Sequence, residues 1–132
     1  MIDIHALPFD QFQRYRLVAD LVEQALGSKR GRVLDVGGRT ELLQAFLKSH
    51  DIFLVDVEAS DAKGLILGSG AALPFADDSF DAVCAFDTLE HVPVALRDDF
   101  VRECARVCRG YVFLAGPYDD PDVARSEELL QE

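Results

Sequence analysis

The sequence is poor in the features that mark several large classes of protein. Its 132 residues include three cysteines, a small and odd number that fits a reducing cytoplasm better than a disulfide framework. No stretch approaches the ~20 apolar residues that a membrane-spanning helix needs. The N-terminus also lacks the basic and apolar regions of a signal peptide. We therefore expect a cytoplasmic protein with no membrane partner.

Basic residues are also few. The chain has 13 Lys and Arg against 24 Asp and Glu, for a net charge of −11. Binding to a nucleic-acid backbone needs clustered Lys and Arg, so this balance argues against a nucleic-acid partner. Repeats, linkers and low-complexity stretches are absent too. We expect residues 1–132 to form one domain, with a helical lead-in over 1–30, a core over 31–116 and an acidic tail over 117–132.

What the sequence does contain is a series of short apolar runs that alternate with helical patterns. Strands without polar alternation are typical of a parallel sheet covered on both faces. Helices are expected over residues 10–26, from residue 42 onward, and from about Pro93 to Gly110. The expected strands cover residues 33–36, 52–55, 65–67, 82–86 and 111–115. The alternation predicts an α/β three-layer sandwich, with a mostly parallel sheet in the order 3-2-1-4-5.

Three segments should meet at the carboxyl ends of these strands, where ligands bind to such sheets. The first is the glycine turn within Val33–Thr40, the second is Asp56, and the third is the loop Gly68–Asp81. Each has a simpler interpretation: the glycines suit any tight turn, and Asp56 alone is more often a cap or a loop residue. The combination at this spacing favours a site for an adenosine-bearing cofactor.

The same segments resemble class I S-adenosylmethionine-dependent methyltransferases, in particular those that act on small molecules. The resemblance covers about Arg32 to Gly116. It implies a Rossmann-like fold, S-adenosylmethionine as cofactor and a small-molecule acceptor. It rests on V-L-D-V-G-G-R-T at 33–40, L-V-D-V-E at 54–58, A-L-P-F-A-D-D-S-F-D-A-V at 72–83 and D-T-L-E-H-V-P at 87–93.

For the first half of the cofactor site, the resemblance implies five residues. Asp35, Gly37 and Gly38 would lie against the methionine part of the cofactor. Asp56 would hold the ribose hydroxyls, and Val57 would lie beside the adenine.

For the second half, it implies that Ser69, Gly70 and Ala71 border the adenine ring. Phe86 and Asp87 would close the pocket toward the acceptor. No Asn-Pro-Pro-Tyr-like motif for methylating base amino groups is present, which agrees with the charge argument.

His91 is the candidate catalytic residue. It follows the fourth expected strand, near where an acceptor would lie, and it would act as a general base if the acceptor must lose a proton. Its alternative is a structural role at the entrance to the next helix. Asp87 and Glu90 flank the same opening and would suit a polar acceptor. We expect no metal site, because Cys104 and Cys108 lack further ligands nearby.

The sequence also departs from the family pattern. Arg39 and Glu41 replace two glycines of the usual turn, Ser69 replaces an acidic residue, and the family's last two strands have no counterpart. These departures favour an alternative function, a non-catalytic module that keeps the fold for binding or assembly. A nicotinamide dehydrogenase fragment is a third hypothesis, although residues 37–42 do not fit G-x-G-x-x-G.

The last expected strand is apolar and would form an open edge of the sheet. Such an edge invites pairing with another chain. We therefore expect either a homodimer in which two fifth strands meet or a cover formed by the tail from Asp119 onward.

Overall fold

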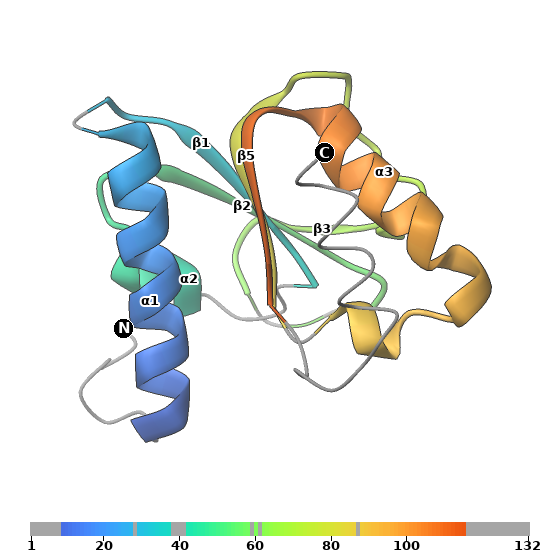
Figure 1. Cartoon of the computed structure of the whole chain (residues 1–132), viewed down its shortest axis with the longest axis horizontal. Helices are drawn as coiled ribbons and strands as arrows, with labels where there is room; N and C mark the ends of the chain where they lie inside the picture. The colour runs from blue at the N-terminus through green and yellow to red at the C-terminus, as the bar shows by residue number, and fades with distance from the viewer. Residues whose placement is uncertain are drawn as a thin grey trace.

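The computed structural model describes residues 9–27, 29–37, 42–58, 60, 62–86 and 88–115. Within them, one parallel sheet has the predicted strand order β3-β2-β1-β4-β5 (Figure 1). The elements are α1 (Phe9–Leu26), β1 (Arg32–Val36), α2 (Leu42–Phe46), β2 (Asp51–Asp56), β3 (Leu65–Leu67), β4 (Phe80–Phe86), the 3-10 turns η2 (Leu89–His91) and η3 (Val94–Leu96), α3 (Arg97–Val107) and β5 (Cys108–Ala115).

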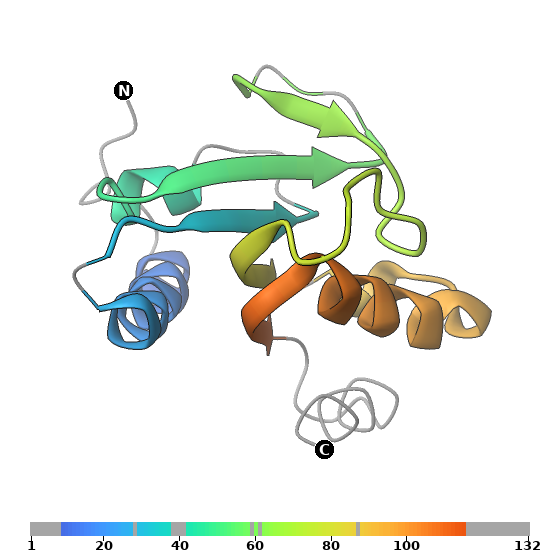
Figure 2. The same ribbon diagram turned by 90° about the horizontal axis from the view of Figure 1, so that it is seen from above.

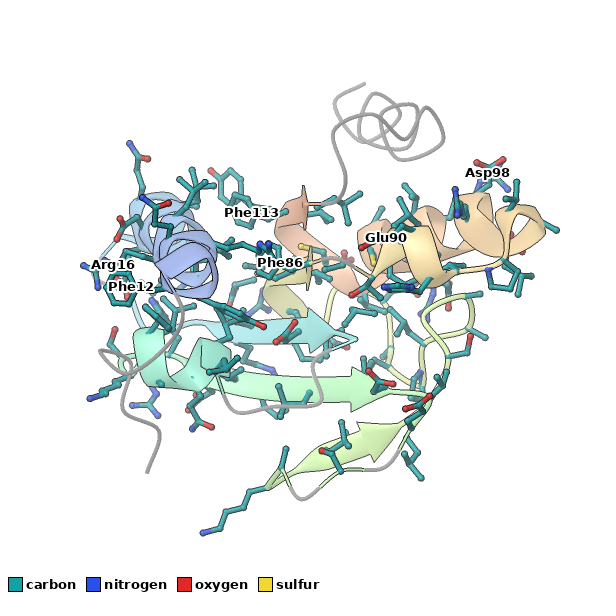
Figure 3. The ribbon with its side chains drawn as sticks, turned by 90° about the horizontal axis from the view of Figure 1, so that it is seen from below. Phe12, Arg16, Phe86, Glu90, Asp98 and Phe113 are labelled. Atoms are coloured by element: carbon teal, nitrogen blue, oxygen red, sulfur yellow. The ribbon has the colours of Figure 1, made fainter. Side chains whose placement is uncertain are left out.

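Helices cover the sheet on both faces, so the predicted three layers are confirmed (Figure 2). Helices α1 and α2 cover one face. The α1 residues Val18 and Val22, four apart, are buried with Val33 of β1 and Cys84 of β4. Phe86 and Phe113 extend this contact from β4 and β5 toward α1 (Figure 3).

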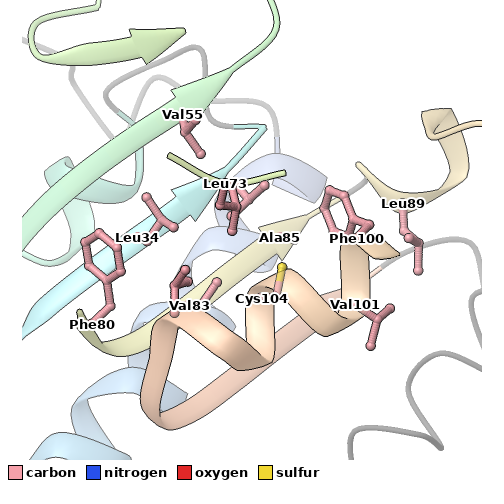
Figure 4. Packing of buried hydrophobic residues seen from close by; sticks show 12 residues of the cluster. Leu34, Val55, Leu73, Phe80, Val83, Ala85, Leu89, Phe100, Val101 and Cys104 are labelled. Carbon is pink, nitrogen blue, oxygen red and sulfur yellow. The ribbon is translucent and has the colours of Figure 1, made fainter. Parts of the chain in front are cut away.

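Helix α3 covers the opposite face. Phe100 and Cys104, also four residues apart, are buried against Leu34 of β1 and Val83 of β4 (Figure 4). Full burial of a side chain such as Phe100 contributes roughly 2–3 kcal/mol. Since Leu34 faces α3 and Val33 faces α1, both faces of β1 are apolar, as its sequence predicts.

The last helix and strand differ from the prediction in their bounds. Pro93 has an extended backbone, so a 3-10 turn follows it and α3 begins only at Arg97. The helix ends at Val107 rather than at Gly110, because Cys108 already pairs with Phe80 in the sheet. Cys108, which the expected helix from Pro93 to Gly110 would contain, therefore lies in β5, and that expectation is wrong.

The connection from β2 to β3 contains no helix among its described residues. The acidic tail over 117–132 lies outside the described residues.

Candidate functional site

A cavity of about 590 Å³ opens at the carboxyl ends of the strands, within the roughly 300–1,000 Å³ typical of ligand sites. It lies beside the ends of β1 and β4, where the strand order reverses and where open α/β sheets bind ligands. We call it the switch-point cavity. The predicted site residues that line it are Gly37, Asp56, Val57, Ser69, Gly70, Ala71, Phe86 and His91.

Three predicted site residues are not part of this lining. Gly38 and Asp87 lie outside the described residues. Asp35 is described and 3% exposed, but it does not line the cavity. It alternates with Leu34 and Val36, which face α3, so its side chain lies on the face covered by α1 and α2.

Burial, and to a smaller extent the charge of Asp56, together raise the pKa of Asp35 to about 7. The two carboxylates lie at the ends of neighbouring strands, with Asp35 in register with Leu54 of β2.

Gly37, the described residue of the glycine turn after β1, is held from two sides. Gly37 has φ of 83°, a left-handed conformation that favours glycine, and its N–H donates to the carbonyl of Val55 at 2.7 Å. A Cβ at Gly37 would overlap the side chain of Thr88. The sequence therefore needs glycine at this position for conformation and for space. The two departures from the family pattern in this turn, Arg39 and Glu41, lie outside the described residues.

Thr88 is a lining residue that our sequence analysis missed. Its Oγ1 lies 2.9 Å from the carbonyl oxygen of Phe86 and 3.2 Å from that of Val36. Its sequence signal is its place in the segment D-T-L-E-H-V-P, two residues after the end of the fourth strand.

The two carboxylate oxygens of Asp56 differ: one accepts a hydrogen bond within its own loop, and the other has no donor among the described residues. Its Oδ1 accepts the N–H of Glu58 at 3.0 Å, so the simpler interpretation as a turn residue is partly correct. Among the described residues, no donor reaches its Oδ2, and the residue lines the cavity. Val57 follows with 70% of its surface exposed, an apolar wall at the rim.

The loop after β3 forms the facing wall. The oxygen of the Ser69 hydroxyl accepts the N–H of Ala71 at 3.1 Å, which leaves its proton to donate. Gly70 packs so closely on α3 that a Cβ would overlap the ring of Phe100. The loop is therefore fitted to α3 as well as to the sheet.

Arg106 and Glu103 of α3, which the sequence did not indicate as important, hold the continuation of this loop. Arg106 donates to the carbonyls of Leu73 at 3.0 Å and Phe75 at 2.9 Å, and it pairs with Asp77 and Glu103 at 2.8 and 2.6 Å. Glu103 in turn accepts the N–H of Leu73 at 2.8 Å. The hydrogen bond from Arg106 lowers the pKa of Glu103. One turn of α3 thus positions the loop that ends at β4.

His91 lies in η2, at the edge of the cavity. Its side chain is 79% exposed, and its Nε2 lies 3.8 Å from Oε1 of Glu90. The imidazole is open to solvent and can exchange protons with it. The described residues contain no cluster of His, Cys, Asp or Glu that would hold a metal ion. No described helix combines the length and hydropathy that crossing a bilayer requires.

A smaller cavity of about 320 Å³ lies at the amino ends of the strands, and we call it the amino-end cavity. Its lining includes Gly31, Asp81, Arg109 and Gly110. Asp81 accepts a hydrogen bond from Arg109 at 2.7 Å and another from the N–H of Arg32 at 2.8 Å. The bond from Arg109 lowers the pKa of Asp81. Because both hydrogen bonds to this carboxylate come from residues of the chain itself, the switch-point cavity is the better candidate for a ligand site.

Comparisons with known proteins agree with this fold. The PH0226 protein from Pyrococcus horikoshii OT3 superposes with a TM-score of 0.66 at 22% identity, over 84% of this chain and 60% of that one. The YcgJ protein from Bacillus subtilis gives 0.66 at 22% identity, over 86% and 55%. A putative S-adenosyl-L-methionine-dependent methyltransferase from Methanococcus maripaludis gives 0.63 at 16% identity, over 89% and 63%.

The chain therefore spans less than two thirds of the length of these structures. No curated protein sequence matches it significantly. A family model described as "Methyltransferase domain" matches residues 34–114, which begin within β1, end within β5 and contain every residue that lines the switch-point cavity. The chain belongs to the methyltransferase domain family.

Proposed function

We propose that the chain binds S-adenosylmethionine in the switch-point cavity and transfers its methyl group to a small-molecule acceptor. The observation that carries the proposal is the meeting of the glycine turn, Asp56 and the loop Ser69–Ala71 around one cavity at the strand reversal. Residues far apart in the sequence thus line the space that an adenosine-bearing ligand would fill.

Each wall has a role that follows from its chemistry. The open Oδ2 of Asp56 would accept a ribose hydroxyl, and the exposed Val57 would lie against the adenine. Ser69 would donate its remaining proton to a ring nitrogen, because its oxygen already accepts the N–H of Ala71. When bound, the cofactor would supply an electrophilic methyl group from its sulfonium: the acceptor would bond to the methyl carbon while the sulfur–carbon bond breaks and S-adenosylhomocysteine leaves.

We propose His91 as the general base for an acceptor that must lose a proton. The imidazole lines the cavity, and its solvent exposure lets it pass that proton to water. Substitution to Gln should lower the turnover number for a proton-bearing acceptor and leave the affinity for the cofactor unchanged.

Calorimetric titration with S-adenosylmethionine and S-adenosylhomocysteine tests the proposal, with NAD as the control ligand. Asp56→Asn should weaken binding by about tenfold or more, since a hydrogen bond to a charged group contributes about 1.5–3 kcal/mol. Asp99→Asn is the matched control, an exposed carboxylate on α3 outside the cavity lining. Equal loss in both variants, or none in Asp56→Asn, would contradict the assignment.

One observation favours a second candidate, a non-catalytic module that keeps the fold. The family pattern has an acidic residue where this chain has Ser69. The Ser69 hydroxyl oxygen already accepts the N–H of Ala71, so it is a poorer acceptor for the adenine amino group. A chain that releases no heat with either S-adenosyl ligand would favour this candidate. We also propose a cytoplasmic location, which the three free thiols of Cys84, Cys104 and Cys108 support.

A further inference from the structure

Thr88 connects the two strands between which the switch-point cavity opens. Val36 is the last residue of β1 and Phe86 the last of β4, and the Thr88 Oγ1 lies within hydrogen-bond distance of both carbonyls. A hydroxyl has one proton, so this proton serves the terminal carbonyls of two strands that are far apart in the sequence. All three residues line the cavity.

The same side chain limits the glycine turn. Thr88 packs against Gly37, whose N–H is held by Val55 of β2 at 2.7 Å. Gly37 is therefore held on one side by its hydrogen bond to the Val55 carbonyl of β2 and bounded on the other side by the Thr88 side chain, which follows β4. Displacement of Thr88 would release the turn on one side.

We propose that Thr88 is a positioning residue of the cofactor site, which sets the glycine turn relative to the exit of β4. It acts through the carbonyls of Val36 and Phe86 and through its contact with Gly37. The part of this inference that concerns the ligand rests on the proposed function. The part that concerns the turn does not.

The test compares two substitutions at Thr88 with a matched control. Thr88→Val keeps the shape and removes the hydroxyl, whereas Thr88→Ser keeps the hydroxyl. Ser79→Ala removes a hydroxyl that donates to the carbonyl of Ala76 at 2.6 Å, outside the cavity lining. By calorimetry, Thr88→Val should bind S-adenosylhomocysteine about tenfold more weakly, with Thr88→Ser and Ser79→Ala within about twofold of the wild type.

A second measurement needs no ligand. Amide hydrogen exchange at Gly37 should be about tenfold faster in Thr88→Val and unchanged in the other two variants. Unchanged exchange in Thr88→Val would overturn the proposal, as would wild-type affinity in that variant or an equal loss in Thr88→Ser. If the wild type binds no S-adenosyl ligand and exchange still accelerates, the proposed function fails and the positioning role of Thr88 stands.

Discussion

Replacement of Asp35 by Asn should change how the stability of the chain depends on pH. Asp35 is 3% exposed, and burial together with the charge of Asp56 raises its pKa from 3.8 to about 7. Between these two pH values, the folded state holds a proton that the unfolded state has released. The free energy of unfolding contributed by this proton is fully present below pH 3.8 and falls as the pH rises through about 7.

The size of the effect follows from the pKa. A rise from 3.8 to about 7 corresponds to about 4 kcal/mol of stability lost between acid and neutral pH. The amide that Asp35→Asn introduces does not ionise, so the variant should lack this loss. Its free energy of unfolding, minus that of the wild type, should increase by up to about 4 kcal/mol from about pH 4 to about pH 8.

Urea unfolding of both proteins across this pH range measures the difference directly, and other titrating groups cancel in it. Asp99→Asn, which removes an exposed carboxylate on α3, is the matched control. Asp56→Asn should narrow the pH range over which the stability falls, since the charge of Asp56 is the second cause of the raised pKa of Asp35. A flat difference for Asp35→Asn, or one that falls with rising pH, would refute the reasoning.

Three further predictions concern the walls of the cavity and the sheet edge. Gly70→Ala should lower the free energy of unfolding by about 1–3 kcal/mol in urea, because the added Cβ meets the ring of Phe100; an unchanged midpoint would contradict the packing. Arg106→Met should accelerate amide exchange at Leu73, whose N–H and carbonyl depend on the Glu103 and Arg106 pair, and exchange at wild-type rates would show that the loop is held otherwise. Among the described residues, β5 is an edge strand of the sheet and its Tyr111 is 53% exposed, so we expect either a second copy or the tail from Asp119 onward to cover this edge. Light scattering should report a dimer in the first case, and a monomer with fast amide exchange in β5 would contradict both.

The strand order could be predicted from the sequence because each strand is a short apolar run without polar alternation. Where helix and strand patterns overlap, the prediction was wrong. Cys104 and Cys108 have helical spacing, but the pairing of Cys108 with Phe80 places the second cysteine in β5. Pro93 indicated a helix start, yet its extended backbone delays α3 to Arg97. Local spacing does not show where tertiary pairing ends a helix.

The residues of the candidate site could likewise be predicted only in part. Asp56 and the loop over 68–71 could be predicted because the carboxyl ends of parallel strands meet at one edge of a sheet. Thr88 and Arg106 could not, since their partners lie 52 residues away on β1 and about 30 residues away in the loop. Asp35 was predicted to lie against the cofactor, but its side chain is buried within β1 and does not line the cavity.

The most direct test of the central claim is an NMR titration of the wild-type chain with S-adenosylhomocysteine, read at backbone amides. The account predicts that the shifts concentrate at Gly37, Val57 and the loop Ser69–Ala71, which line the switch-point cavity, while Gly31 and Gly110 of the amino-end cavity stay unchanged. No shifts at saturating ligand, or shifts centred on Gly31 and Gly110, would contradict it.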